Sequence, residues 1–142
     1  MFAYPFKGYW RDVGTIESLW EANMDLINDP EAVDLNDPQW RIYTNTNDTP
    51  PTKYLENAKV KKSFVANGTV IDGTIENSII GREVIIGKGA VIKNCVIFSG
   101  SKIATNAVLE NVIIDKRAKV EKKLELKGTE NNPLYIKEGD RV

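Results

Sequence analysis

Apolar residues recur every five or six positions between about residue 60 and residue 120, and the pattern repeats along the chain. When the sequence is shifted by seventeen residues, residues 76–80 fall on residues 93–97, which fall in turn on residues 110–114. The recurring apolar positions are Val65, Ile71, Ile75, Ile80, Ile86, Ile92, Phe98, Ile103, Leu109, Ile114 and Val120. A fixed period of this kind is typical of a repeat protein, in which each unit buries its apolar face against its neighbours.

Residues 86–91 and 103–108 come close to an ideal hexapeptide, with an aliphatic residue, a small residue, two variable residues and then alanine. In a parallel β-helix with triangular coils, short strands send one aliphatic side chain inward and small residues let the backbone turn each corner. Three such units form a coil of roughly 17 to 18 residues, which predicts about three to four coils.

The fold class that follows is mainly β, a left-handed parallel β-helix of hexapeptide-type coils preceded by a short helical junction. We expect one continuous core, lined by Ile80, Ile86, Ile92, Ile103, Leu109 and Ile114. Ordinary half-buried strands in a β-sandwich are the alternative, but they would make the seventeen-residue register accidental.

The first fifty residues follow a different pattern. Thr15 is a suitable N-cap for an amphipathic helix of about twelve residues that ends before Pro30. The apolar face of this helix consists of Ile16, Leu19, Trp20, Met24 and Ile27. Short strands are predicted over residues 8–13, 40–43, 124–126 and 134–136. A polar linker ending in two prolines places the domain boundary near residue 50, which gives a junction segment, 1–50, and a β-helix domain, 51–142.

Composition and charge narrow the function. The net charge of −1 provides no broad basic surface for nucleic acid. The sequence has no apolar run long enough to span a bilayer and no secretory signal pattern, so we expect a cytoplasmic protein without membrane contact. The single cysteine, Cys95, takes the place of Ser78 in the repeat, which predicts a packed small residue rather than a nucleophile.

The chain contains no histidine. Many hexapeptide enzymes are acyltransferases or carbonic anhydrases, in which histidine serves as the general base or the zinc ligand. Acyl transfer and carbonic anhydrase activity are therefore disfavoured for this chain, and a structural, oligomeric or regulatory role is favoured.

Residues 8–15, Gly-Tyr-Trp-Arg-Asp-Val-Gly-Thr, together with residues 16–26, resemble the junction of bacterial glucose-1-phosphate adenylyltransferase, or ADP-glucose pyrophosphorylase. Residues 40–44 and the linker are similar to the segment that leads into the β-helix of that family. The resemblance implies an enzyme that makes ADP-glucose and pyrophosphate from ATP and glucose 1-phosphate for glycogen synthesis. It also implies that the β-helix supports homo-oligomer assembly and allosteric control.

The resemblance assigns two site residues. Asp12 matches an aspartate that binds Mg²⁺ together with a second aspartate from the preceding catalytic domain, and Trp10 matches a tryptophan near the glucose moiety. The glycine-rich nucleotide loop of that domain is not found in this sequence, so we expect a fragment or truncated gene product that is inactive alone, without a complete catalytic site or a bound cofactor. Candidate contacts for a phosphorylated effector are Arg41, Lys53, Lys102, Lys116 and Arg117.

Two further interpretations remain open. The chain could be a self-contained module that oligomerises through its coil faces or edges, or the equivalent part of another sugar-nucleotide pyrophosphorylase.

Overall fold

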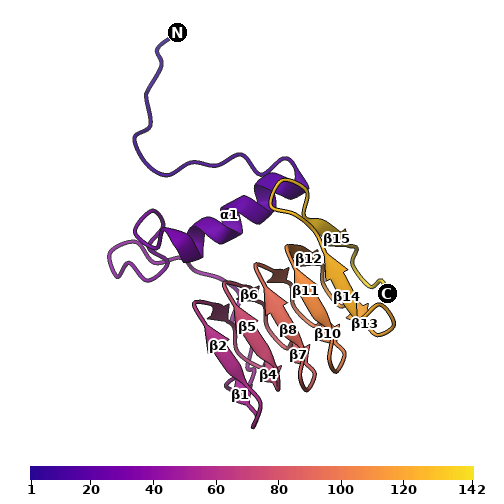
Figure 1. Cartoon of the computed structure of the whole chain (residues 1–142). Helices are drawn as coiled ribbons and strands as arrows, with labels where there is room; N and C mark the ends of the chain where they lie inside the picture. Colours follow the sequence, from indigo (N-terminus) through magenta and orange to yellow (C-terminus); the bar gives the residue numbers. More distant parts are fainter.

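The computed structural model describes residues 1–142, which form one α-helix and a stack of short β-strands (Figure 1). The helix, α1, spans Ile16–Asn28. The strands are β1 (Lys53–Tyr54), β2 (Lys59–Lys61), β3 (Phe64–Val65), β4 (Val70–Ile71), β5 (Thr74–Glu76), β6 (Ile79–Ile80), β7 (Ile85–Ile86), β8 (Val91–Lys93), β9 (Val96–Ile97), β10 (Lys102–Ile103), β11 (Val108–Glu110), β12 (Val112–Ile114), β13 (Lys119–Val120), β14 (Glu125–Lys127) and β15 (Leu134–Ile136).

The strands build three parallel sheets of five strands each. Sheet A has the order β1-β4-β7-β10-β13, sheet B the order β2-β5-β8-β11-β14, and sheet C the order β3-β6-β9-β12-β15. Each coil contributes one strand to each sheet, so the coils are three-sided and stack directly on one another. The predicted parallel β-helix is therefore confirmed, and it extends beyond the repeat at both ends, from Lys53 to Ile136.

The seventeen-residue register holds through the middle of the stack, where Ile86 pairs with Ile103 and Ile103 with Val120. It changes at two corners. Val70 pairs with Ile85, a step of fifteen residues, because only two residues separate β4 from β5. Ile113 pairs with Tyr135, a step of twenty-two residues, because residues 128–133 form a longer corner between β14 and β15.

All six side chains predicted to line the core belong to one buried cluster, and none of them is more than 2% exposed. Phe98, which the apolar rhythm placed in the same series, is a correction to that prediction. Ile97 occupies the inward position between Ile80 and Ile114, and Phe98 lies one residue beyond β9, where it packs against the cluster around α1. Cys95 is fully buried in the core, as its place in the repeat predicted.

Asparagines turn the corner between sheets B and C. Asn77, Asn94 and Asn111 follow each other at the same corner of successive coils and adopt left-handed φ angles of 48°, 50° and 53°. Asparagine visits this region more readily than most residues. The Asn77 side-chain amide donates a hydrogen bond of 2.7 Å to Asn94 Oδ1, so neighbouring corners are also linked through their side chains.

Helix α1 forms as predicted. Thr15 is the N-cap and forms a capping box with Ser18, so that two backbone N–H groups at the start of the helix have partners. Trp20, Met24 and Ile27 form its buried face, whereas Ile16, which was predicted on the same face, is 43% exposed in the first turn.

The strands predicted over residues 8–13 and 40–43 are wrong. Both segments have the alternating side chains of a strand, but neither has a neighbouring strand to complete a hydrogen-bond ladder. Residues 1–13 form no backbone hydrogen bond with the rest of the chain, and Figure 1 shows them leading away from the solenoid.

Candidate functional site

The junction between the N-terminal segment and the β-helix is built on α1, which lies across the outer face of sheet C (Figure 1). Trp20, Met24 and Ile27 pack against Val96 and Ile113. The indole Nε1 of Trp20 also donates a hydrogen bond of 2.8 Å to the carbonyl oxygen of Asn94. Apolar burial and this bond together fix the helix on the solenoid.

A charged cluster connects residues 9–11 to α1. The Arg11 guanidinium donates to Asp25 Oδ2 from Nη2 at 2.5 Å and from Nε at 3.1 Å, and its Nη1 lies 3.2 Å from Glu21 Oε2. The Tyr9 hydroxyl donates to the same Asp25 oxygen at 2.8 Å. Asp25 is therefore the centre of the cluster.

The ionisation of Asp25 is consistent with this role. Partial burial acts to raise the pKa of Asp25, but the hydrogen bonds from Arg11 and Tyr9 outweigh it and hold the pKa below its ordinary value. Burial and the bond to Asp25 raise the pKa of Tyr9. At neutral pH the carboxylate is thus charged and the phenol keeps its proton, as the hydrogen bonds require.

Trp10 and Asp12, the two site residues expected from the sequence, lie beside this cluster but are not part of it. The side chain of Trp10 is 74% exposed, and Asp12 is also exposed. Asp12 Oδ1 accepts a hydrogen bond of 3.1 Å from the backbone N–H of Gly14. Both side chains are therefore open to solvent, and Trp10 also lines a hollow over α1 with Leu19 and Leu26.

These residues do not fit a complete metal site. No group of three or more Asp, Glu or Cys side chains in the chain is arranged to hold a metal ion. Asp12 could contribute one carboxylate, which is the kind of ligand Mg²⁺ takes, but the remaining ligands would have to come from outside this chain.

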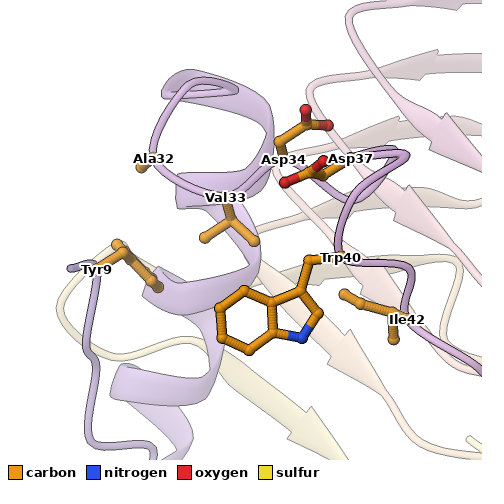
Figure 2. A pocket seen from close by; sticks show the side chains of 7 residues that line it. All are labelled: Tyr9, Ala32, Val33, Asp34, Asp37, Trp40 and Ile42. Atoms are coloured by element: carbon orange, nitrogen blue, oxygen red, sulfur yellow. The ribbon is translucent and has the colours of Figure 1, made fainter.

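A hollow of about 410 Å³ opens next to the junction (Figure 2). Its walls are mainly apolar and come from Tyr9 and from the stretch after α1, with Ala32, Val33, Asp34, Asp37, Trp40 and Ile42. The strand predicted over residues 40–43 does not lead to this hollow. The available signal in the sequence is the presence of Val33, Trp40 and Ile42 among polar residues, and Trp40 is 83% exposed in the structure.

The basic residues considered for an effector do not converge on one site. Lys53 and Lys102 lie in sheet A with β4 and β7 between their strands. Arg117 forms an ion pair with Glu138, and Arg41 lies in the stretch before the linker. The structure therefore provides no clustered anion site from these side chains.

Comparison with known proteins identifies the family. Residues 50–132 match the GlmU-like, C-terminal hexapeptide family. The chain belongs to that family. Residues 1–29 match a second family, nucleotidyl transferase, so the hexapeptide coils follow a stretch that is similar to nucleotidyltransferases.

Several curated relatives of this chain carry the name glucose-1-phosphate adenylyltransferase. They confirm the resemblance to that family that the sequence showed. The protein of that name from Clostridioides difficile (strain 630) is 49% identical over 113 residues, which is 80% of this chain and 26% of the relative. Those from Bacillus thuringiensis (strain Al Hakam) and Bacillus anthracis are each 42% identical over 121 residues, or 85% of this chain and 32% of the relative. The chain thus spans between about a quarter and a third of the length of these relatives.

The single helix, α1, is too short and too polar to span a membrane.

Proposed function

We propose that this chain is the junction and β-helix part of a glucose-1-phosphate adenylyltransferase, which makes ADP-glucose and pyrophosphate from ATP and glucose 1-phosphate in the cytoplasm. The observation that carries the proposal is the order of the two family matches, nucleotidyl transferase over residues 1–29 and hexapeptide coils over residues 50–132. Relatives named for this activity match 80% and 85% of the chain.

In this proposal residues 1–50 are the junction segment and residues 51–142 the β-helix domain. Trp10 presents its aromatic face to the glucose moiety, and Asp12 provides one carboxylate oxygen to Mg²⁺, whose charge offsets that of the phosphates. Both side chains are exposed on the junction, where a nucleotidyltransferase domain could reach them. The chain alone lacks a complete site and is inactive.

The proposal is tested by assaying two proteins with ATP, glucose 1-phosphate and Mg²⁺. One is the chain alone, and the other is the chain joined to the nucleotidyltransferase part of the Clostridioides difficile relative. We expect ADP-glucose only from the joined protein. Formation by the chain alone, above a buffer control, would contradict its predicted inactivity. A folded joined protein that makes no ADP-glucose would contradict the proposed function.

The site residues are tested in the same joined protein. Asp12→Asn should abolish most of the activity, because the neutral amide no longer provides a negatively charged ligand for the metal. Glu17→Gln is the matched control, since Glu17 is an acidic residue in the first turn of α1 and forms no ion pair with the segment carrying Asp12. Equal activity of the two variants would remove Asp12 from the site.

Assembly into a homo-oligomer is part of the proposal, and the open end of the solenoid supports it. Tyr54 and Val60 occupy inward positions of the first coil but are 56% and 37% exposed, whereas their neighbours Ile71 and Ile75 are fully buried. Light scattering should find an oligomer that Val60→Glu dissociates. If light scattering found the wild-type chain to be a monomer, the open end of the solenoid would not be the assembly surface, and other parts of the enzyme would have to provide it.

A further inference from the structure

We propose that Arg11 and Asp25 form a positioning clamp that holds Trp10 and Asp12 in a fixed orientation relative to the β-helix. This inference rests on the proposed function, because it concerns the two side chains assigned to the substrate and the metal. The clamp itself is defined by the hydrogen bonds from Arg11 and Tyr9 to Asp25.

The geometry of residues 9–12 separates the side chains into two sets. Residues 9–12 belong to no helix or strand, so their side-chain contacts distinguish the two sets. Tyr9 and Arg11 both form hydrogen bonds with Asp25 on α1. Trp10 and Asp12 alternate with them in the sequence and form no hydrogen bond with the helix; both are exposed, and Trp10 lines a hollow over α1 with Leu19 and Leu26. Attachment of one set therefore determines the direction in which the other set points.

The segment has little else to hold it. Residues 1–13 form no backbone hydrogen bond with the rest of the chain, and no strand lies beside them. Tyr9 lines the hollow described above with Val33 and Trp40, and Trp10 lines a second one over α1. The hydrogen bonds of Tyr9 and Arg11, mainly to Asp25, are the directional contacts between residues 9–12 and the helix.

The other end of the clamp is rigid. Asp25 follows Met24, which is buried against sheet C, and Trp20 in the preceding turn is bonded to the Asn94 carbonyl. The capping box at Thr15 fixes the start of the same helix. An unbroken series of contacts therefore runs from a corner of the solenoid, through α1, to the segment that carries Trp10 and Asp12.

This arrangement gives α1 a functional role beyond linking two domains. Reacting groups must be held closely in place, and a misplacement of about 1 Å can cost on the order of a hundredfold in rate. Arg11 and Asp25 touch neither substrate nor metal in this proposal. They act through Trp10 and Asp12, so they are positioning residues.

The first test uses the chain itself and measures ¹⁵N NMR order parameters. In the wild-type chain, residues 9–13 should have values near 0.85, which is typical of rigid backbone. Asp25→Asn should lower them to about 0.6 or less, while the strands of sheet C keep their values. The exchange of charges in Arg11→Asp combined with Asp25→Arg should restore most of the order. Unchanged values in Asp25→Asn would overturn the clamp.

The second test uses the joined protein described above. Asp25→Asn should lower kcat by about ten- to a hundredfold and raise the Mg²⁺ concentration needed for half-maximal rate, whereas Glu17→Gln should change neither. The charge exchange should recover kcat. An active joined protein whose kcat is insensitive to Asp25→Asn would overturn the positioning role. A wild-type joined protein without activity would instead contradict the proposed function, and the NMR measurement would still decide whether the clamp exists.

Discussion

The indole Nε1 of Trp20 lies 2.8 Å from the carbonyl oxygen of Asn94, at the corner between β8 and β9. Asn94 has a left-handed backbone at this point, with φ of 50°. Its carbonyl accepts from the helix, whereas the carbonyl of Asn111, at the same corner of the next coil, accepts from the backbone N–H of Leu134. The contact joins a residue of the junction to the repeat and explains how α1 is held at one place along sheet C.

Trp20→Phe should weaken this attachment by about 1–2 kcal/mol, because the aromatic packing remains but the hydrogen bond is lost. Trp20→Ala should cost about 3–5 kcal/mol, since the packing is lost as well. Native-state hydrogen exchange of the α1 amides measures the free energy of opening. Trp40→Phe is the control, because Trp40 is 83% exposed and should change little. If the free energy of opening of α1 were the same in Trp20→Phe and Trp40→Phe, the hydrogen bond from Trp20 to Asn94 would contribute nothing to the attachment.

Cys95 provides a pH-dependent prediction. Burial raises the pKa of the Cys95 thiol to about 12. At pH 8 the native protein should therefore resist alkylation and react only after unfolding, which mass spectrometry with iodoacetamide can follow.

The same shift affects stability. Between pH 9 and about 12 the unfolded thiol ionises while the folded one stays protonated, so stability is lost as pH rises through this range. The loss approaches about 1.4 kcal/mol per pH unit for one group. Cys95→Ser should flatten this dependence in urea unfolding experiments at several pH values. If the free energy of unfolding fell equally steeply with pH in Cys95→Ser and in the wild type, Cys95 would not be the group that ionises on unfolding in this range.

The repeat could be predicted from sequence because each coil must place an aliphatic side chain inward at the same position. The position of α1 over sheet C could not be predicted in the same way. In residues 79–80, 96–97 and 113–114 of this sheet, the second apolar residue is in the core and the first packs in the cluster around α1. Sheets A and B contain pairs of the same kind, at residues 85–86 and 91–92 for example, so the apolar pattern alone does not indicate which sheet the helix covers.

The junction could be predicted only in part. The helix followed from its cap and its period, both of which are local properties of the sequence. The bonds from Tyr9 and Arg11 to Asp25 join residues that are sixteen and fourteen positions apart and have no period. The pattern of residues 8–13 predicted a strand, but it could not reveal that no partner strand lies beside them.

Sheet B has a ladder of alternating charges on its outer face. Lys61, Glu76, Lys93, Glu110 and Lys127 lie opposite one another on its five successive strands. Neighbouring strands are about 4.8 Å apart, so each of the three inner charges lies close to two of opposite sign and each end charge to one. The ladder favours the observed pairing of coils.

Lys93→Glu should destabilise the fold by about 1 kcal/mol, because three acidic side chains would then stand in a row. The effect should shrink in 1 M salt, where exposed charges are screened over about 3 Å. Lys88→Glu is the matched control, since Lys88 is an exposed corner residue outside the ladder. Urea unfolding at low and high salt measures both variants. A salt-independent loss in Lys93→Glu would point to packing instead of charge.

Gly87 tests how tightly the corners stack. A Cβ atom at this position would lie 2.6 Å from the backbone nitrogen of Thr105 and 2.8 Å from the carbonyl carbon of Ala104, in the next coil. Neither atom belongs to a flexible side chain, so the coils would have to separate locally. Gly87→Ala should therefore cost about 1–3 kcal/mol and lower the Tm by several degrees in thermal unfolding followed by circular dichroism.

Gly14→Ala is the control for this substitution, because the added methyl group would meet only Asp12 Oδ1, at 3.4 Å. Neither glycine has a left-handed φ, so the comparison isolates the space available at each site from backbone strain. If Gly87→Ala unfolded at the same temperature as Gly14→Ala, the corner would be able to widen without loss of packing. Small residues at the corners would then be required by the turn of the backbone and not by the close packing of neighbouring coils.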